Sequence, residues 1–285
     1  MKHLLFLGIM ATMLLLAGCQ GDELNRADPV LVVEGWIEDG EFPCVFVTSS
    51  IPVSTAYQSL DDLGQYLIRY ARVAVSDGDT TVILTGKVDR DIFPPYHYTT
   101  SYLRGKAGKT YTLTVDYGDH HVSGQTTIPA PVPVDSFVVE PSRADSFYSM
   151  KAWFYNERSE DRYYKVFTRH HSSEDRLYYS PFICSYEGAI LPDTAAIEVF
   201  WEKRLGWGEY RIYFHINDTV DIRFCTMDYA AWQYWSDYEA IIALSRNQLL
   251  NVTDNLPTNL SGGIGYWCGY GSRYYTVSIR EAIGE

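Results

Sequence analysis

Strict alternation of apolar and polar residues is the pattern that most constrains how this chain can fold. Over Tyr111–Tyr117 every second residue is Tyr, Leu, Val or Tyr, and the residues between them are Thr, Thr and Asp. Because successive side chains of a strand point to opposite faces, this pattern predicts a strand with one buried face. The period recurs across Pro29–Ile128, between turn pairs such as Asp39-Gly40 and Gly118-Asp119. We therefore predict an all-β, mainly antiparallel fold that begins with an immunoglobulin- or fibronectin-like β-sandwich over residues 29–128.

The second half of the chain keeps this period but is richer in aromatic residues. The three prolines within Pro129–Pro133 cannot donate hydrogen bonds to a sheet, so we interpret residues 129–136 as an exposed proline-rich linker. Of the 43 Phe, Trp and Tyr residues, 30 follow residue 136, which predicts an aromatic-rich β domain over residues 137–285. Large apolar residues recur at helical spacing from Trp232 to Ile242 and predict one amphipathic helix over residues 227–245.

A hydrophobic leader that ends in a lipidation motif precedes these domains. The apolar run Leu4–Leu16 follows a cationic head and is shorter than the roughly 20 apolar residues of a membrane-spanning helix. It ends in Leu16-Ala17-Gly18-Cys19, which resembles the motif that bacterial lipoprotein signal peptidase cleaves. We predict a lipoprotein signal peptide over residues 1–18, lipidation of Cys19 and a polar tether over residues 19–28. Two or three acyl chains hold a protein firmly, so we expect a lipid anchor. Asp22 and Glu23, just after Cys19, resemble the acidic export signal of surface-displayed bacterial lipoproteins, which implies a location in the cell outer membrane, facing the exterior.

The charge balance and the cysteine count limit the classes of partner and of crosslink. The chain has 36 Asp and Glu residues against 23 Lys and Arg, a net charge of −13. Because nucleic-acid affinity comes from Lys and Arg contacts with phosphate, we expect no nucleic-acid partner. After lipidation four cysteines remain, and their spacing decides neither whether a disulfide forms nor which residues it joins. They are Cys44, Cys184, Cys225 and Cys268.

The sequence contains no recognised motif for catalysis or metal binding. Neither CxxC nor HExxH occurs, and the pairs His120-His121 and His170-His171 would place neighbouring imidazoles on opposite strand faces. No serine lies in a GxSxG motif. We therefore expect no catalytic residue, no metal and no cofactor. The sequence does not decide whether two carboxylates form a catalytic pair, because glycosidase chemistry needs only two acids at a suitable separation.

Several stretches of the sequence resemble one family of bacterial lipoproteins. They include LVVEGWIEDG at Leu31–Gly40, TIPAPVPVDS at Thr127–Ser136 and LPTNLSGGIGYWCGYG at Leu256–Gly271. Together with the motif at Cys19, they are similar to the Bacteroidetes outer-membrane lipoproteins of domain-of-unknown-function family 4249. This resemblance implies an accessory role in uptake beside a TonB-dependent receptor, and it supplies no catalytic residues.

The glycine-rich stretch Gly262–Gly271 contains the candidate ligand-binding residues Tyr266, Trp267 and Tyr270. Glycine inside a strand is typical of a bulge or of a close approach by another backbone. Two interpretations stay open. Either the aromatic rings fill a core beneath the predicted helix, or a loop projects them toward a ligand or receptor.

Taken together, these features predict a non-enzymatic surface lipoprotein that binds a ligand or partner for a TonB-dependent receptor in nutrient uptake. Two alternatives remain, a surface hydrolase acting on glycan or peptide and a structural or adhesive surface lipoprotein. A converging pair of acids or a histidine cluster in a cleft would favour hydrolysis. An open sandwich without a cleft would favour adhesion.

Overall fold

The structure, a computed structural model, describes most of the chain after the predicted leader. The described residues are 30–50, 64–142, 146–158, 160–172, 176–181, 184–201, 203–205, 209–211, 213–245 and 257–284. The predicted signal peptide, Cys19 and the tether lie outside these ranges and stay predictions. Within the described ranges, no helix has the length and apolar character needed to cross a membrane.

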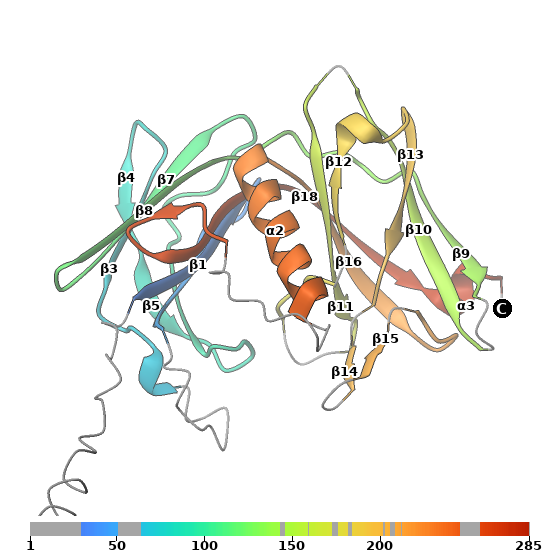
Figure 1. Ribbon diagram of the computed structural model, residues 1–285, viewed down its shortest axis with the longest axis horizontal. Helices are drawn as coiled ribbons and strands as arrows, with labels where there is room; N and C mark the ends of the chain where they lie inside the picture. The colour runs from blue at the N-terminus through green and yellow to red at the C-terminus, as the bar shows by residue number, and fades with distance from the viewer. Residues whose placement is uncertain are drawn as a thin grey trace, which may run out of the picture.

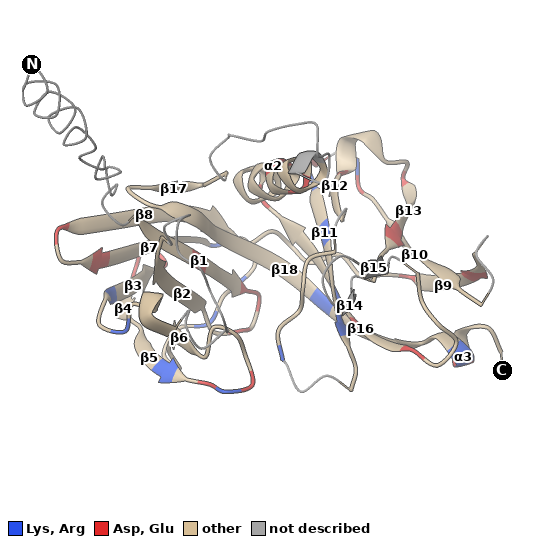
Figure 2. Ribbon diagram, turned by 60° about the horizontal axis from the view of Figure 1, so that its bottom comes forward, with Lys and Arg blue, Asp and Glu red and all other residues tan. Residues whose placement is uncertain are grey.

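An eight-stranded sheet runs through the whole molecule and takes strands from both halves of the chain (Figure 1). In spatial order its strands are β12 (Ser185–Glu187), β11 (Tyr163–His170), β16 (Thr219–Met227), β18 (Ile264–Ser278), β1 (Leu31–Glu38), β2 (Cys44–Ser49), β6 (Tyr96–Thr99) and β5 (Thr85–Val88). The strand β18 is parallel to β1 over Ile264–Tyr270 and antiparallel to β16 over Tyr270–Ser278. One strand of 15 residues therefore joins an N-terminal group of strands to a C-terminal group, and Figure 2 shows it continuous between them.

Two smaller sheets pack on one face of this central sheet. The five-stranded sheet has the order β17 (Leu260–Ser261), β8 (His120–Thr127), β7 (Thr110–Tyr117), β3 (Arg72–Ser76) and β4 (Thr81–Ile83). The three-stranded sheet has the order β13 (Thr194–Val199), β10 (Tyr148–Tyr155) and β9 (Ser136–Pro141), and a separate hairpin pairs β14 (Lys203–Leu205) with β15 (Glu209–Arg211). Trp267 and Tyr275, an even number of residues apart on β18, point to the same face. Trp267 lies in the core beneath the five-stranded sheet, and Tyr275 packs against the core beneath the three-stranded sheet.

The first core confirms the alternation seen in the sequence. Of the residues predicted to share one face of β7, Tyr111, Leu113 and Val115 are buried, while Tyr117 at the strand end is 40% exposed. They meet the buried face of β1, which alternates in the same way. The predicted all-β, mainly antiparallel architecture with sandwich-like packing is therefore confirmed, and the β1–β18 pair is parallel.

The proline-rich segment is packed against the second core, so the expectation of an exposed linker is wrong. Val132 and Val134 are 4% and 9% exposed and belong to the core between the central and three-stranded sheets. The backbone N–H of Val134 donates a hydrogen bond of 2.7 Å to the Tyr275 hydroxyl, and the Ala130 carbonyl accepts one of 2.9 Å from Thr226 Oγ1. Proline removes backbone donors only, so carbonyls and the intervening residues still bind the neighbouring strands.

The boundary predicted at residues 129–136 separates the two cores. It does not separate the sheets, because the central sheet takes strands from both sides of it. Most of the first core comes from residues before it, yet Leu260 and Trp267 reach that core from the end of the chain. The second core contains only residues after Pro131. Whether residues 29–128 form an independently folding domain stays a prediction.

A single long helix covers the opposite face of the central sheet, as Figure 1 shows. This helix, α2 (Tyr229–Ser245), was predicted over residues 227–245 and begins two residues later. Asp228 caps it, because Oδ1 accepts a hydrogen bond of 2.9 Å from the Ala231 N–H. Asp228 Oδ2 accepts hydrogen bonds of 2.7 Å from the hydroxyl of Thr126 and from the backbone N–H of Thr127, which fixes the start of the helix to β8. The short helix α3 (Ile279–Ala282) follows β18.

Replacing Trp267 should test how much β18 contributes to the first core. The indole is 0% exposed, and its Nε1 donates a hydrogen bond of 3.0 Å to the Tyr111 carbonyl. We expect Trp267→Ala to lower the free energy of unfolding by about 3–5 kcal/mol, measured by urea denaturation. Trp153→Ala is the matched control, since Trp153 is 36% exposed. Equal losses in the two variants would contradict a core role for Trp267.

Candidate functional site

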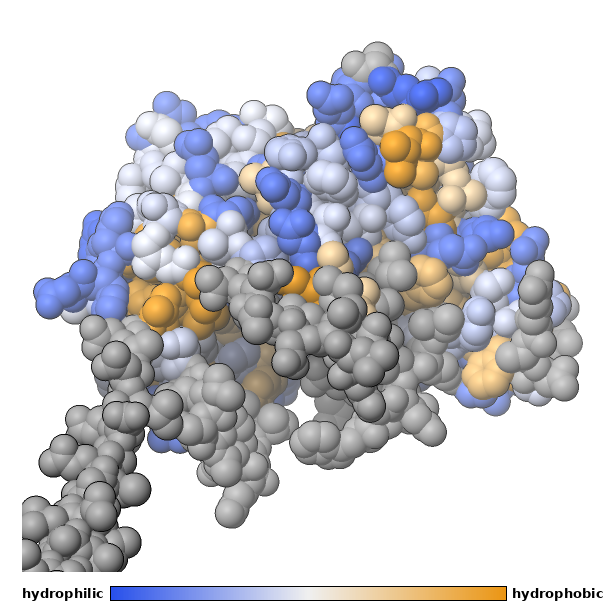
Figure 3. Space-filling model, in the orientation of Figure 1, coloured by the Kyte–Doolittle hydropathy of each residue, from blue (hydrophilic) through white to orange (hydrophobic). Residues whose placement is uncertain are grey.

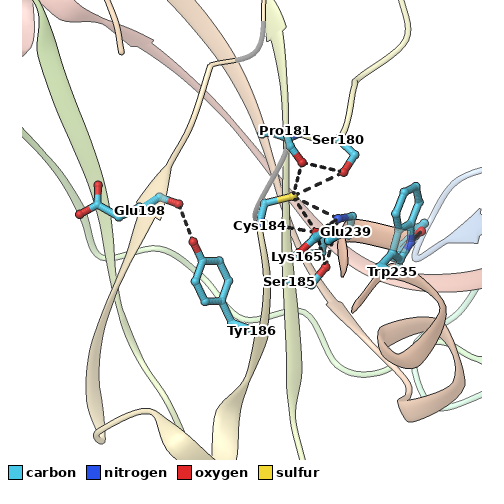
Figure 4. A network of polar contacts seen from close by, with 10 residues as sticks. Lys165, Ser180, Pro181, Cys184, Ser185, Tyr186, Glu198, Trp235 and Glu239 are labelled. Atoms are coloured by element: carbon cyan, nitrogen blue, oxygen red, sulfur yellow. Dashed lines mark hydrogen bonds and ion pairs between the residues drawn. The ribbon is translucent and has the colours of Figure 1, made fainter. Parts of the chain in front are cut away.

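The covered face of the central sheet contains a buried cluster of polar side chains beneath α2 (Figure 4). Lys165 on β11 donates a hydrogen bond of 2.9 Å from Nζ to Glu239 Oε1 on α2. The same ammonium lies 3.1 Å from Cys184 Sγ and 3.1 Å from Ser185 Oγ. Glu239 Oε1 also accepts a hydrogen bond of 2.7 Å from the Ser185 hydroxyl. One carboxylate oxygen therefore holds together the helix, β11 and the start of β12.

Aromatic rings enclose this ion pair. Lys165 Nζ lies 4.3 Å from the ring centroid of Trp235, a distance at which the indole face attracts a cation. Trp235 Nε1 in turn donates a hydrogen bond of 2.7 Å to the hydroxyl of Tyr270 on β18. Trp235 thus shields the cation and fixes α2 to the central strand.

Burial sets the protonation of the cluster. Burial raises the pKa of the Cys184 thiol to about 11, although Lys165 acts in the opposite direction, so the sulfur is protonated at neutral pH. Burial acts to lower the pKa of Lys165, but Cys184 and Glu239 outweigh it and hold that pKa above its ordinary value. The cluster at neutral pH is therefore a charged ammonium–carboxylate pair beside a neutral thiol.

A thiol, a carboxylate and an ammonium within hydrogen-bond reach are also the groups that nucleophilic acyl transfer uses. Glu239 Oε1 lies 3.4 Å from Cys184 Sγ, close enough to accept its proton. Cys184 is nevertheless 0% exposed, so a substrate cannot reach the sulfur in this arrangement. The geometry makes the cluster an anchor for α2.

The anchor residues were missed in the sequence. Lys165 is separated by 19 residues from Cys184 and by 74 from Glu239, so no local motif joins them. The available signal was a lysine inside the predicted strand Tyr163–His170, which places a charge on one face of that strand. Only folding shows that this face is covered.

A second buried ion pair joins the two groups of strands in the central sheet. Arg223 Nη1 on β16 lies 2.8 Å from Glu38 Oε1 on β1, and the Tyr274 hydroxyl donates a hydrogen bond of 2.6 Å to Glu38 Oε2. The Arg223 guanidinium carbon lies 4.0 Å from the Phe167 ring centroid. Since the side chains of Arg223 and Glu38 are only 7% and 5% exposed, the pair is well shielded from water.

Three aromatic rings form a partly exposed cluster where α2 begins. Tyr229 is 55% exposed, and its ring centroid lies 5.6 Å from that of Tyr163 and 5.7 Å from that of Trp232. The rings of Tyr163 and Trp232, both half-buried, are 5.0 Å apart. We call these three residues the aromatic cluster. Its residues stand on a strand and at the start of a capped helix, so their backbone positions are set by regular structure.

The aromatic residues singled out in the sequence lie largely in cores. Trp267 and Tyr270 are 0% and 1% exposed, so neither contacts a ligand from these positions. Tyr266 is half-buried, with its ring centroid 4.9 Å from that of Tyr234 on α2. The interpretation of a projecting loop is therefore not supported for Trp267 and Tyr270.

The glycines of the same stretch lie close to neighbouring backbone, Gly265 against β1 and Gly262 and Gly269 against β8. Gly265 has a φ of +113°, and a Cβ there would lie 2.0 Å from the Val33 carbonyl oxygen. Gly265 therefore lies at a close approach of two backbones, which is one of the two explanations for a glycine inside a strand given above. All four cysteines described by the structure, including Cys268 of this stretch, are free. Among the described residues, no group of three His, Cys, Asp or Glu side chains is placed to hold a metal ion.

Hydrophobic residues also reach the surface away from α2. Figure 3 shows hydrophobic colour over the region of β12 and β13. Ile190, in the short 3-10 helix Gly188–Ile190 between these strands, is 77% exposed. Single exposed apolar residues are common, so this feature by itself indicates no function.

Removing one member of the anchor pair should destabilise the protein strongly. Lys165→Met leaves Glu239 buried without its cation, and we expect the free energy of unfolding to fall by about 3–5 kcal/mol. The double variant Lys165→Met/Glu239→Leu should recover much of this loss in urea denaturation. Lys151→Met is the control, because the ion pair of Lys151 with Glu198 is well exposed and its loss should have little effect. A Lys165→Met loss as small as that of the control would exclude the anchoring role.

Comparison with known proteins identifies the family. A search of curated protein sequences finds no match to this chain. Among solved structures, a cytokine receptor complex matches with 9% sequence identity, covering 87% of this chain and 96% of that chain. Its TM-score is 0.26, so we draw nothing from it. The model of the family described as "Domain of unknown function (DUF4249)" matches residues 21–275, and the chain belongs to that family.

Proposed function

We propose that this protein is a lipid-anchored, surface-exposed outer-membrane lipoprotein that binds a partner without catalysing a reaction. Its role would be that of an accessory protein for a TonB-dependent receptor in nutrient uptake. The lipidation motif ending at Cys19 supports the anchor. The resemblance to Bacteroidetes lipoproteins supports the outer membrane and the receptor as partner.

The observation that carries the binding role is the aromatic cluster Tyr163, Tyr229 and Trp232. Tyr and Trp are enriched where proteins bind each other, because their rings bury much apolar area and keep a polar group for hydrogen bonding. Rings already held on rigid elements lose little conformational freedom when a partner binds. The Lys165–Glu239 pair and the Asp228 cap supply that rigidity from beneath.

A surface hydrolase remains the second candidate because of one observation. Cys184, Glu239 and Lys165 provide a nucleophile, a proton acceptor and a cation within 3.4 Å of one another. Their burial means that hydrolysis would require α2 to move away from the sheet. The binding role needs no such movement, so we favour it.

Replacing Cys19 tests the anchor. Cys19→Ala removes the thiol that accepts the lipid, so we expect no incorporation of labelled palmitate and loss of the protein from the outer-membrane fraction. The control is Cys44→Ala, which leaves the lipidation motif intact. Wild-type membrane fractionation of the Cys19→Ala protein would show that something other than acyl chains attaches it.

Replacing Tyr229 tests the contact surface. The wild-type protein, purified from solubilised outer membrane, should bring a TonB-dependent receptor with it, identified by mass spectrometry. We expect Tyr229→Ala to reduce receptor recovery about tenfold, the effect of losing ~1.4 kcal/mol at an interface hot spot. Tyr102→Ala, at a residue 88% exposed in the first half of the chain, should recover the receptor normally. Undiminished recovery with Tyr229→Ala would place the contact elsewhere.

A further inference from the structure

We propose that Lys165 and Cys184 are a site of oxidative crosslinking, at which a peroxide joins Nζ and Sγ by a covalent S–N bond. The two atoms lie 3.1 Å apart, and both residues are 0% exposed. Held at this distance by the packing around them, the reacting atoms need little further reorganisation. The inference concerns the residues of the anchor and does not depend on the proposed binding role.

The carboxylate of Glu239 is an independent observation in favour of this chemistry. Its Oε1 lies 2.9 Å from Lys165 Nζ and 3.4 Å from Cys184 Sγ, so one acceptor is within reach of the protons of both groups. Cys225 offers a contrast within the same chain. It is equally buried, but its sulfur contacts the Ser272 hydroxyl at 3.4 Å, which supplies no amine.

The reaction balances with a peroxide as the only oxidant. The thiol reduces hydrogen peroxide to water and becomes a sulfenic acid, a two-electron oxidation of sulfur. Lys165 gives one proton to Glu239, and the free amine attacks the sulfur of the sulfenic acid. The S–O bond breaks as the S–N bond forms, and the hydroxyl leaves with a second amine proton as water. Two waters, a protonated Glu239 and a neutral S–N bridge result.

Hydrogen peroxide is far smaller than a glycan or peptide, so its access to the buried sulfur requires a smaller opening than hydrolysis would. Cys184 directly precedes β12, a strand of three residues at the edge of the sheet. Short edge strands belong to the parts of a protein that open most easily. Burial raises the pKa of the thiol, and the pKa of Lys165 is held above its ordinary value, so thiolate and free amine are both scarce and the reaction is expected to proceed slowly, through the open form.

The crosslink would remove one of the contacts that hold α2 to the sheet. The bridged nitrogen carries no positive charge, so Glu239 loses its cation and α2 loses the ion pair that holds it to β11. The bridge itself joins β11 to Cys184, whose carbonyl already accepts a hydrogen bond of 3.1 Å from the Val166 N–H of β11. Oxidation would therefore loosen the helix that carries Tyr229 and Trp232 and leave the sheet intact.

The test is mass spectrometry of the full chain after treatment with hydrogen peroxide. We expect a loss of two hydrogens, mapped under non-reducing conditions to linked peptides containing Lys165 and Cys184, and reversed by a thiol reductant. Amide hydrogen exchange of α2 should rise in the same sample. Cys225→Ser should behave like the wild type, whereas Lys165→Arg, which keeps a positive charge, should give no crosslink.

If Lys165→Arg fails to fold, Cys184→Ser provides the same test. This variant has no thiol at the site, so the crosslink must be absent from it. Three results would overturn the proposal. They are a sulfur that oxidises to its acids while Lys165 stays free, a bridge that retains an added oxygen, and an unmodified Cys184 under conditions that oxidise Cys225.

Discussion

The pairing of β18 with two different neighbours is the constraint on which the rest of the structure depends. Its 15 residues span about 50 Å at the usual rise of a strand, enough to serve two sets of strands in turn. Its first half hydrogen-bonds to β1 and its second half to β16. Both small sheets then pack on one face of a single continuous sheet. The two cores are thereby coupled through a shared strand, and the proline-rich segment is packed at the boundary between them.

The opposite face of that sheet carries charges that have to be neutralised once it is covered. Lys165 and Arg223 lie on neighbouring strands, and each meets one carboxylate and the face of at least one aromatic ring. Buried ion pairs contribute little net stability when compared with apolar packing, but a broken pair is costly. The main effect of these ion pairs is therefore to fix where the paired helix and strands lie. Glu239 satisfies Lys165 only if α2 lies where it does, and Glu38 satisfies Arg223 only if β1 and β16 flank β18.

The fixed position of these elements also links this face to the proposed binding role. The Asp228 cap and the Glu239 anchor fix α2 at its start and near its middle. Tyr229 and Trp232 lie on the first turn of the helix, and Tyr163 lies at the start of β11. Any change that removes the cation from Lys165 would therefore act on the exposed rings through the helix. The proposed binding at the surface and the proposed chemistry of the buried cluster are connected by this one helix.

The sequence by itself determined the local structure. Alternation over Tyr111–Tyr117 identified a strand and its buried face, and apolar spacing from Trp232 identified the helix α2 to within two residues. These predictions succeed because burial of one face depends on residues close together in the chain. The glycines of Gly262–Gly271 likewise indicated a close backbone approach, although not to which strand.

Only the tertiary structure decided which distant residues meet. Trp267 belongs to the first core and Tyr270 supports α2, although both come from the glycine-rich stretch that also suited a projecting loop. Lys165 meets Glu239 from 74 residues away, and no periodicity encodes that distance. A strand pattern shows that a side chain faces one way, but what covers that face depends on the order of strands in the sheet. That order is set by long-range pairing, here by β18 lying between β1 and β16.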